Sequence, residues 1–315
     1  METLNHLQAA REAQRAQANR DELVERIARA VPHDGMVEPL KGLYLQRVSA
    51  STEPVYGVSD PAFCVIAQGS KVMLVGDQRL RYDPGHYLLA TAEIPVTGEI
   101  IDASPERPYL SLRLQFDPTL VGSVMVEARH PAPRSHAAVR ALAVSPLDAS
   151  LLDDVVRLVR QLDTPADARF LAPLITREII YRLLMGAQGD RLRQIAVLGG
   201  ATQRIAEAIE RIRNDFNQPL RIEELAQAVG MSVSGFHYHF KAVTAMSPGQ
   251  FQKQLRLQEA RRLLLGEHLD AASAGFRVGY DDASYFTRDY KRLFGAPPMR
   301  DVARVRDAVT AGVSL

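Results

Sequence analysis

The spacing of hydrophobic residues changes along this 315-residue chain. Between residues 42 and 116, short runs alternate polar and apolar side chains, as in Tyr109–Phe116, which is the pattern of a strand with two different faces. From about residue 147 onwards, apolar residues recur every three or four positions, as in amphipathic helices. The sequence therefore predicts an α+β protein with a β-rich front part and a helical back part.

Short strands with turn residues between them predict a small barrel or sandwich in the front part. Gly76-Asp77 is typical of a two-residue hairpin, and Asp83-Pro84-Gly85 of a tight turn. The predicted strands are Leu43–Val48, Phe63–Gln68, Lys71–Val75, Gln78–Tyr82, His86–Thr91, Val96–Ile101 and Tyr109–Phe116.

Helices are predicted on both sides of this β-rich segment. Residues 3–30 are rich in Ala, Gln, Arg and Glu, but only the part near 20–30 has apolar residues to bury, so we expect a helix there and a weakly ordered arm before it. Apolar stripes predict two more helices, at 147–162 and 170–184. Residues 191–200 are expected to link them to a helix at Gln203–Phe216.

One pattern occurs twice in the last third of the chain, which indicates a duplicated supersecondary unit. The two copies match at an offset of fifty residues, except that their glycines, Gly230 and Gly279, lie forty-nine apart. The matching pairs are Phe236 and Phe286, Phe240 and Tyr290, Lys241 and Lys291, Val243 and Leu293, and Pro248 and Pro298.

Each copy is predicted to form a helix, a glycine turn and a second helix. Ser232 is expected to cap the second helix of the first copy, and Asp281 or Asp282 that of the second. A helix from Ser247 and Pro248 to Gly266 is predicted to join the copies. Either copy alone would fit an ordinary helical hairpin, but two in register on one long helix favour DNA binding.

About 100 residues here resemble the DNA-binding domain of AraC/XylS-type transcription regulators. The resemblance rests on PLRIEELAQAVGMSVSGFHYHFKAVTAMSPGQFQKQLRLQEARRLLL and VGYDDASYFTRDYKRLFGAPPMRDV. It implies a double helix-turn-helix that contacts two successive segments of the major groove. The family's base-reading positions map onto Ser234, His237 and Tyr238, and onto Ala283, Ser284, Thr287 and Arg288. Two residues depart from the family pattern, because Arg221 is a poor helix cap and Ala283 has no hydrogen-bonding group.

The chemistry of these side chains supports the same assignment. Arg288 suits bidentate recognition of guanine, whereas Lys241, Lys291 and Arg292 are expected over phosphates. Taken singly, each of these cations would fit a solvated helix face. The predicted DNA-contacting set is Ser232, Ser234, His237, Tyr238, Lys241, Ser284, Thr287, Arg288, Lys291 and Arg292.

Charge and cysteine content fit such a regulator. Residues 191–315 hold 18 Lys and Arg against 13 Asp and Glu, a net charge of +5, whereas residues 1–190 hold 20 against 24, a net of −4. The single cysteine, Cys64, permits no internal disulfide. The sequence contains no apparent signal peptide and no run of eighteen apolar residues, so we expect a cytoplasmic protein without a membrane span.

The front part resembles the cupin-like effector domain of many such regulators, which implies an unknown small-molecule effector and a homodimer. Tyr56, His86 and Arg113 are the candidate effector-binding residues. A metal-dependent cupin enzyme with a helical interaction tail is the alternative, but His86 is the only histidine among the predicted strands, so no metal, cofactor or catalytic residue is predicted. A DNA-alkyl-transfer protein would need a reactive thiolate, and Cys64 has no adjacent basic group.

We therefore expect residues 1–190 to sense an effector and residues 191–315 to bind double-stranded DNA. The protein is predicted to be a sequence-specific transcription regulator rather than an enzyme. The resemblance implies an activator rather than a repressor, because activation is the commoner mode in that family. RNA polymerase is a further candidate partner.

Overall fold

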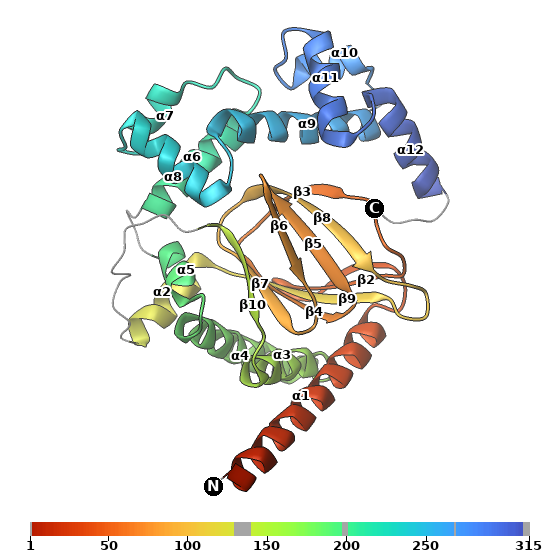
Figure 1. Ribbon diagram of the computed structural model, residues 1–315, viewed down its shortest axis with the longest axis vertical. Coiled ribbons are helices and arrows are strands. Elements are labelled where there is room, and N and C mark those ends of the chain that lie inside the picture. Colours follow the sequence, from red (N-terminus) through yellow and green to blue (C-terminus); the bar gives the residue numbers. More distant parts are fainter. Residues whose placement is uncertain (1, 129–139, 197–200, 268, 311–315) are drawn as a thin grey trace.

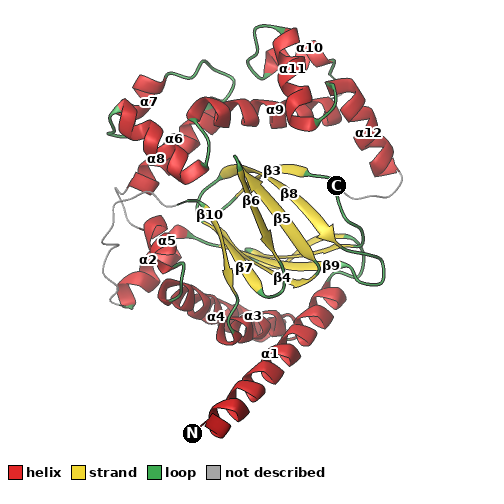
Figure 2. Cartoon of the chain, viewed as in Figure 1, coloured by secondary structure: helices red, strands yellow, loops and turns green. Residues whose placement is uncertain are grey.

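A β-barrel lies between two sets of helices in the computed structural model, which describes residues 2–128, 140–196, 201–267 and 269–310 (Figure 1). One set, α1 to α5, covers one side of the barrel. The other set, α6 to α12, lies across the opposite side. The α+β architecture predicted from the sequence is confirmed, with a β-rich front domain, flanking helices and an all-helical C-terminal part (Figure 2).

The described strands form two antiparallel sheets. One has the order β1-β2-β9-β4-β7-β10 and the other the order β3-β8-β5-β6. Their bounds are β1 Gly35–Leu40, β2 Leu43–Val48, β3 Val55–Ser59, β4 Ala62–Gln68, β5 Ser70–Val75, β6 Gln78–Tyr82, β7 His86–Ala90, β8 Ile94–Asp102, β9 Tyr109–Gln115 and β10 Leu142–Pro146.

The seven predicted strands are present, each within two residues of its expected bounds, but β1, β3 and β10 were not predicted. These three are among the four strands at the outer ends of the sheets, where a strand has one partner and needs fewer apolar residues; the fourth, β6, was predicted from its hairpin turn. Most of β1 is exposed, and β3 is short and contains Gly57. The apolar alternation that reveals a half-buried strand is therefore missing from them.

Helices α1 to α5 belong to the front domain. Their bounds are α1 Glu2–Ala30, α2 Pro118–Glu127, α3 Ala149–Arg160, α4 Pro165–Met185 and α5 Gly189–Ala196. Helices α3 and α4 confirm the two predicted stripes, whereas α2 was not predicted. The expected linker at 191–200 was partly wrong, because α5 reaches Ala196 and packs against α2 and α4.

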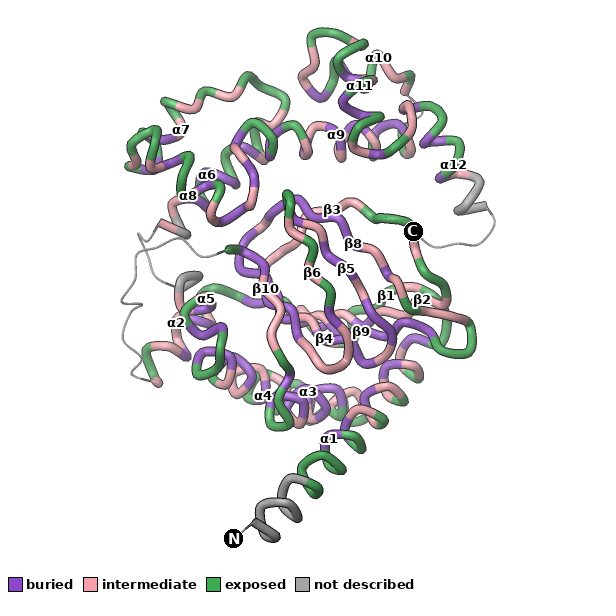
Figure 3. The backbone as a smooth tube through the Cα atoms, viewed as in Figure 1, coloured by how far each residue is buried: buried purple, intermediate pink, exposed green. Residues whose placement is uncertain are grey.

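The helix predicted near residues 20–30 is present, but the weakly ordered arm predicted before it was wrong, because α1 starts at Glu2. Its high content of helix-forming residues extends the helix beyond its packed part. Leu23 and Ile27 are buried against the barrel side, and Ala16 is the first buried residue of the described side chains. Residues 10–15, just before it, are exposed (Figure 3).

Two large apolar clusters form the cores of the barrel and its helices. One lies between the larger sheet and helices α1, α3 and α4, with Phe63, Leu112 and Val155 at its centre. The other begins inside the barrel with Ile66, Leu88 and Ile100 and continues into the C-terminal helices. The barrel and the helices that follow it thus share a core. None of the described helices is both long and apolar enough to cross a membrane.

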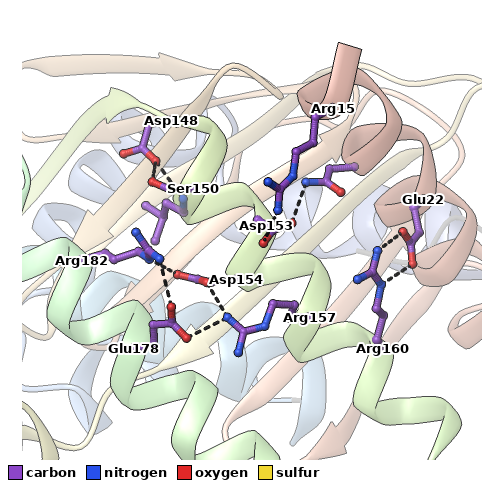
Figure 4. Close-up of polar contacts among 12 residues, drawn as sticks. Arg15, Glu22, Asp148, Ser150, Asp153, Asp154, Arg157, Arg160, Glu178 and Arg182 are labelled. Carbon is purple, nitrogen blue, oxygen red and sulfur yellow. Dashed lines mark hydrogen bonds and ion pairs between the residues drawn. The ribbon is translucent and has the colours of Figure 1, made fainter. Parts of the chain in front are cut away.

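Ion pairs fasten α1 and α4 to α3 (Figure 4). Arg160 of α3 donates from Nε and Nη2 to the two carboxylate oxygens of Glu22 in α1, at 2.8 and 2.6 Å. Nearby, the buried carboxylate of Asp154 pairs with Arg157 and with Arg182 of α4. The guanidinium of Arg160, with a smaller contribution from Arg26, lowers the pKa of Glu22 from 4.5 to about 2.

Replacing Glu22 with Gln is expected to lower the free energy of unfolding at pH 7 by about 1 kcal/mol, a value discounted for the partial exposure of the pair. Because folding lowers this pKa, the ion pair stabilises the protein above pH 4.5 and loses its effect as the pH falls towards 2. Urea unfolding at several pH values checks this. A deficit of the variant that stays constant from pH 7 to pH 3 would contradict it.

Candidate nucleic-acid interface

The first helix-turn-helix unit consists of α7 (Ile222–Ala228) and α8 (Val233–Thr244). Gly230 lies between them with φ of +66°, a left-handed conformation that favours glycine. The Ser232 hydroxyl then caps α8 by accepting from the Gly235 N–H at 3.2 Å. Arg221 provides no side-chain cap for α7, which confirms the weak cap predicted at that position.

The second unit repeats this geometry with α10 (Ala271–Arg277) and α11 (Ala283–Phe294). Gly279 has φ of +92°, and a Cβ there would lie 2.2 Å from the Asn217 carbonyl oxygen. Of the two predicted caps, Asp282 is the one that accepts, from the N–H groups of Ser284 and Tyr285. These hydrogen bonds lower the pKa of Asp282.

Buried aromatic residues at matching positions of the two units pack their helices together. Phe236 and Phe240 of α8 and their counterparts Phe286 and Tyr290 of α11 are fully buried. Where α10 crosses α11, a Cβ on Gly275 would lie 2.9 Å from the Phe286 ring, so this position needs glycine. The buried Ala226 occupies the equivalent place in the first unit. The packing thus presents the remaining faces of α8 and α11 to solvent.

Helix α9 (Pro248–Gly266) joins the two units and packs against both. A capping box between Ser247 and Gln250 fixes its first turn, with Pro248 at the first position. From its middle, the Arg256 guanidinium donates to the carbonyl oxygens of Phe216, Gln218 and Gly279, at 2.7 to 2.8 Å. One side chain thereby ties the segment before the first unit to the turn of the second.

Helices α6 (Ala201–Asn214) and α12 (Pro298–Thr310) complete the set. On α12, the fully buried carboxylate of Asp301 accepts from Arg261 of α9 at 2.7 Å and from the Tyr290 hydroxyl of α11 at 2.9 Å. The buried ion pair therefore fixes α11 and α12 on the far end of α9.

Most of the predicted DNA-contacting side chains are exposed on α8 and α11. In α8, Ser234, His237, Tyr238 and Lys241 are exposed. In α11, the exposed members are Ser284, Arg288, Lys291 and Arg292. Two others have internal roles: the Ser232 hydroxyl serves as the cap, and the partly buried Thr287 donates to the Ala283 carbonyl oxygen at 2.8 Å.

The structure adds one residue to this surface that the sequence reasoning missed. Tyr285 is 57% exposed, and its ring centroid lies 4.7 Å from the Arg288 guanidinium carbon. This cation–π contact holds the arginine against the helix surface. The sequence could have indicated this residue, because Tyr285 follows the predicted contact residue Ser284 in the same helix. It also lies three residues before Arg288, a spacing that places two side chains side by side on a helix.

Lys241 and Arg292 also line a groove of about 560 Å³ between the two units. Lys253 of α9, Asp289 of α11 and the Gly76-Asp77 turn of the barrel complete this side of it. Lys253 pairs with Asp289 at 3.0 Å. The barrel turn thus reaches the space between the two recognition helices.

The barrel contacts both recognition helices at equivalent positions. The Ala141 N–H donates to the Val243 carbonyl oxygen at 2.9 Å, and the Tyr56 hydroxyl donates to the Leu293 carbonyl oxygen at 2.8 Å. Val243 and Leu293 are one of the pairs that the duplication relates. Both bonds use carbonyls in the last turn of a helix, which the helix itself leaves without partners.

Further contacts surround each of these bonds. At the first unit, a Cβ on Gly76 would lie 2.5 Å from the carbonyl oxygen of Ala245, the residue that ends α8 with φ of +60°. At the second unit, the Tyr56 ring packs edge-on against Phe294 with centroids 4.6 Å apart, and Arg304 pairs with Glu53 at 2.7 Å.

The three candidate effector residues all have protein partners. Tyr56 bonds to Leu293 at the boundary with the C-terminal helices, and an imidazole nitrogen of His86 lies 2.8 Å from the Asp83 carboxylate. Arg113 pairs with Asp60 and lies over the Tyr44 ring. Cys64 is a partly buried strand residue, and burial raises the pKa of its thiol to about 11, which disfavours a thiolate.

Metal-binding side chains do not cluster in the part of the chain that is described: no three His, Cys, Asp or Glu residues lie close enough to hold an ion. His130 and His136 lie outside the described residues.

Comparison with protein families matches both halves of the chain. Residues 39–191 match the AraC-type transcriptional regulator N-terminus, and residues 225–304 match a helix-turn-helix domain. Among curated proteins, the transcriptional activator RhaS of Citrobacter koseri is 26% identical over 163 residues, which are 51% of this chain and 57% of that protein. RhaS of Salmonella typhimurium matches to the same extent. The alignment therefore spans little more than half the length of these relatives.

Among solved structures, ToxT from Vibrio cholerae has a similar fold. A 1.65 Å structure of it aligns with a TM-score of 0.52 over 82% of this chain and 97% of that chain, at 10% sequence identity. ToxT with a bound unsaturated fatty acid aligns over 82% of this chain and 94% of that chain, with a TM-score of 0.50 and 10% identity. At this identity the likeness establishes the fold.

The two family matches lie in chain order on the β-rich domain and on the duplicated helical unit, as the resemblance in the sequence predicted. This family consists of transcription regulators and not of enzymes. The chain belongs to the AraC family of transcriptional regulators.

Proposed function

We propose that this protein is a sequence-specific DNA-binding transcription regulator, and an activator like the RhaS relatives, with residues 191–315 binding double-stranded DNA and residues 1–190 sensing a small molecule. The observation that supports this most strongly is the pair of helix-turn-helix units in register on one helix. Their exposed residues can donate to bases and phosphates, and no described cluster of metal ligands supports the cupin enzyme.

In this proposal α8 and α11 enter two successive segments of the major groove. The 19 residues of α9 give it a length of about 28 Å, comparable with the roughly 34 Å of one turn of DNA. Arg288 reads guanine, while His237, Tyr238 and Ser284 contact bases or phosphates. Lys241, Lys291 and Arg292 neutralise phosphates and position the domain.

The barrel controls DNA binding through the carbonyls of Val243 and Leu293. A ligand that binds one docked arrangement of the barrel better than another shifts the population between them, and with it the angle at which each recognition helix meets DNA. The fatty acid held by ToxT supports a small-molecule effector in a protein of this fold. RNA polymerase is the expected partner of the DNA-bound form.

A mobility-shift assay with the full-length protein tests the proposed function. The probe is DNA from the protein's own promoter, with a scrambled duplex of the same composition as control. We expect specific binding that weakens steeply between 50 and 200 mM salt, because phosphate contacts release counterions. Equal affinity for both duplexes at all salt concentrations, or metal-dependent turnover of a small substrate, would contradict it.

Replacing Arg288 with Ala is expected to weaken binding to the specific site by about 1–3 kcal/mol and to relax the base preference at one position. The guanidinium has no ion pair in the described structure, so its loss leaves no buried charge behind. Arg169→Ala, an exposed arginine on α4, is the matched control. Titration of the specific site and its single-base variants measures the effect. An unchanged affinity and preference would show that α11 does not read bases.

We further propose that the protein is a homodimer that pairs through α4. The stripe of apolar side chains predicted there is only partly buried: Ile175 and Ile179 face the core, but Phe170 is 72% and Leu174 50% exposed. An exposed apolar face of this kind is typical of a contact between subunits.

Replacing Leu174 with Asp is therefore expected to convert the dimer to a monomer with little change in folding, because a charge at a subunit contact loses its water. Arg169→Asp on the same helix is the control. Sedimentation equilibrium compares the masses. A wild-type protein that is monomeric, or a variant that stays dimeric, would contradict this proposal.

A further inference from the structure

The barrel contains a lysine that has no counter-ion among the described residues. Lys71 is the second residue of β5, and its neighbours across the sheet are Tyr82 and Ile100. It shares its face of the strand with Met73 and Val75, which are buried in the barrel core. The ammonium thus belongs to the interior side of the smaller sheet.

Neighbouring residues make room for this side chain. Gly98 of β8 lies beside it, and a Cβ at that position would be 2.8 Å from Lys71 Cε and 3.3 Å from Nζ. Any larger residue at position 98 would therefore displace the lysine. Burial lowers the pKa of Lys71, and the nearby Arg113 acts in the same direction.

None of the described carboxylates pairs with Lys71. Asp60 is paired with Arg113, and Glu93 with Arg213 of α6. Glu99 follows Gly98 in the strand, so it lies on the opposite face of the sheet. Lys71, Arg113 and Asp60 together leave one uncompensated positive charge in this part of the barrel.

The other polar groups close to this charge do not neutralise it. Burial raises the pKa of the Tyr82 and Tyr109 hydroxyls and of the Cys64 thiol, so these groups stay neutral. Apolar residues of the barrel core lie beside it, with Met73 on the same face of β5 and Ile100 opposite it in β8. An uncompensated charge in such surroundings is costly, and an added negative charge would offset that cost.

We infer that Lys71 is the anchor for a monoanionic, otherwise apolar ligand, a small organic carboxylate whose head pairs with the ammonium and whose body lies against the apolar residues of the barrel. This inference rests on the proposed function, because it names the chemical class of the effector. It also places that ligand on the strand whose far end, at Gly76, touches the end of recognition helix α8.

Straight-chain carboxylates of six to twelve carbons test this, each compared with the alcohol of the same length. Binding to the full-length protein is measured by calorimetry and by the shift in melting temperature. We expect at least one acid to bind at least about tenfold more tightly than its alcohol, because a hydrogen bond between charged groups is lost in the alcohol.

Three variants locate the site. Lys71→Met is expected to weaken binding of the acid at least about tenfold and to leave binding of the alcohol unchanged, whereas Lys71→Arg retains the preference for the acid. Lys41→Met removes an exposed lysine from the turn between β1 and β2 and is the control. Without ligand, Lys71→Met should melt at or above the wild-type temperature, because it removes an unpaired charge from the barrel.

Three results would overturn the inference: no acid of the series binds, acids and alcohols bind equally, or Lys71→Met binds the acid as the wild type does. None of these measurements involves DNA, so such a result would leave the proposed regulator intact. Conversely, a protein that prefers the acid through Lys71 but binds no specific DNA would contradict the proposed function alone.

Discussion

The position of both recognition helices depends on the packing of α9 between the two units. Leu255 belongs to the core of the first unit, and Leu257, Ala260 and Leu264 to that of the second. Because apolar residues of α9 serve two cores that lie in different directions, the helix is buried on several sides instead of along one stripe. Arg256 and Arg261 add hydrogen bonds to segments on either side. A helix held in this way acts as a rigid spacer, so the distance between α8 and α11 follows from its length.

Because α9 is rigid, the two contacts between the barrel and the recognition helices are coupled. Ala141 and Tyr56 bond to carbonyls at equivalent positions of the duplicated unit, so one domain holds the same end of both reading helices. If α9 were flexible, a movement of the barrel against one helix-turn-helix unit would not change the position of the other unit. With a rigid spacer, a small change in how the barrel docks reorients both helices together. In the proposed function, an effector that alters the barrel would thereby alter the whole DNA-binding surface.

The helical part could be predicted in detail because its constraints are local. Each signal acts on adjacent residues: the glycines Gly230 and Gly279, the caps Ser232 and Asp282, and the helix start at Pro248. Because the unit is duplicated, an element predicted in one copy is supported by the matching element in the other. The barrel was harder to predict, since β1, β3 and β10 are recognisable only through their partners. The role of Tyr56 was not predictable either: it depends on Leu293, which lies 237 residues away in the chain. Lys71 carried no signal in the sequence, because the lack of a carboxylate beside it is a property of the folded barrel.

Methylation interference on the DNA site of the full-length protein tests the central claim most directly. Methyl groups on guanine N7 block contacts in the major groove and so mark where each recognition helix enters it. A spacer of fixed length predicts two groups of blocking positions about one helical turn, or 10–10.5 base pairs, apart on one face of the duplex. A single group of positions, or two groups on opposite faces, would contradict the account.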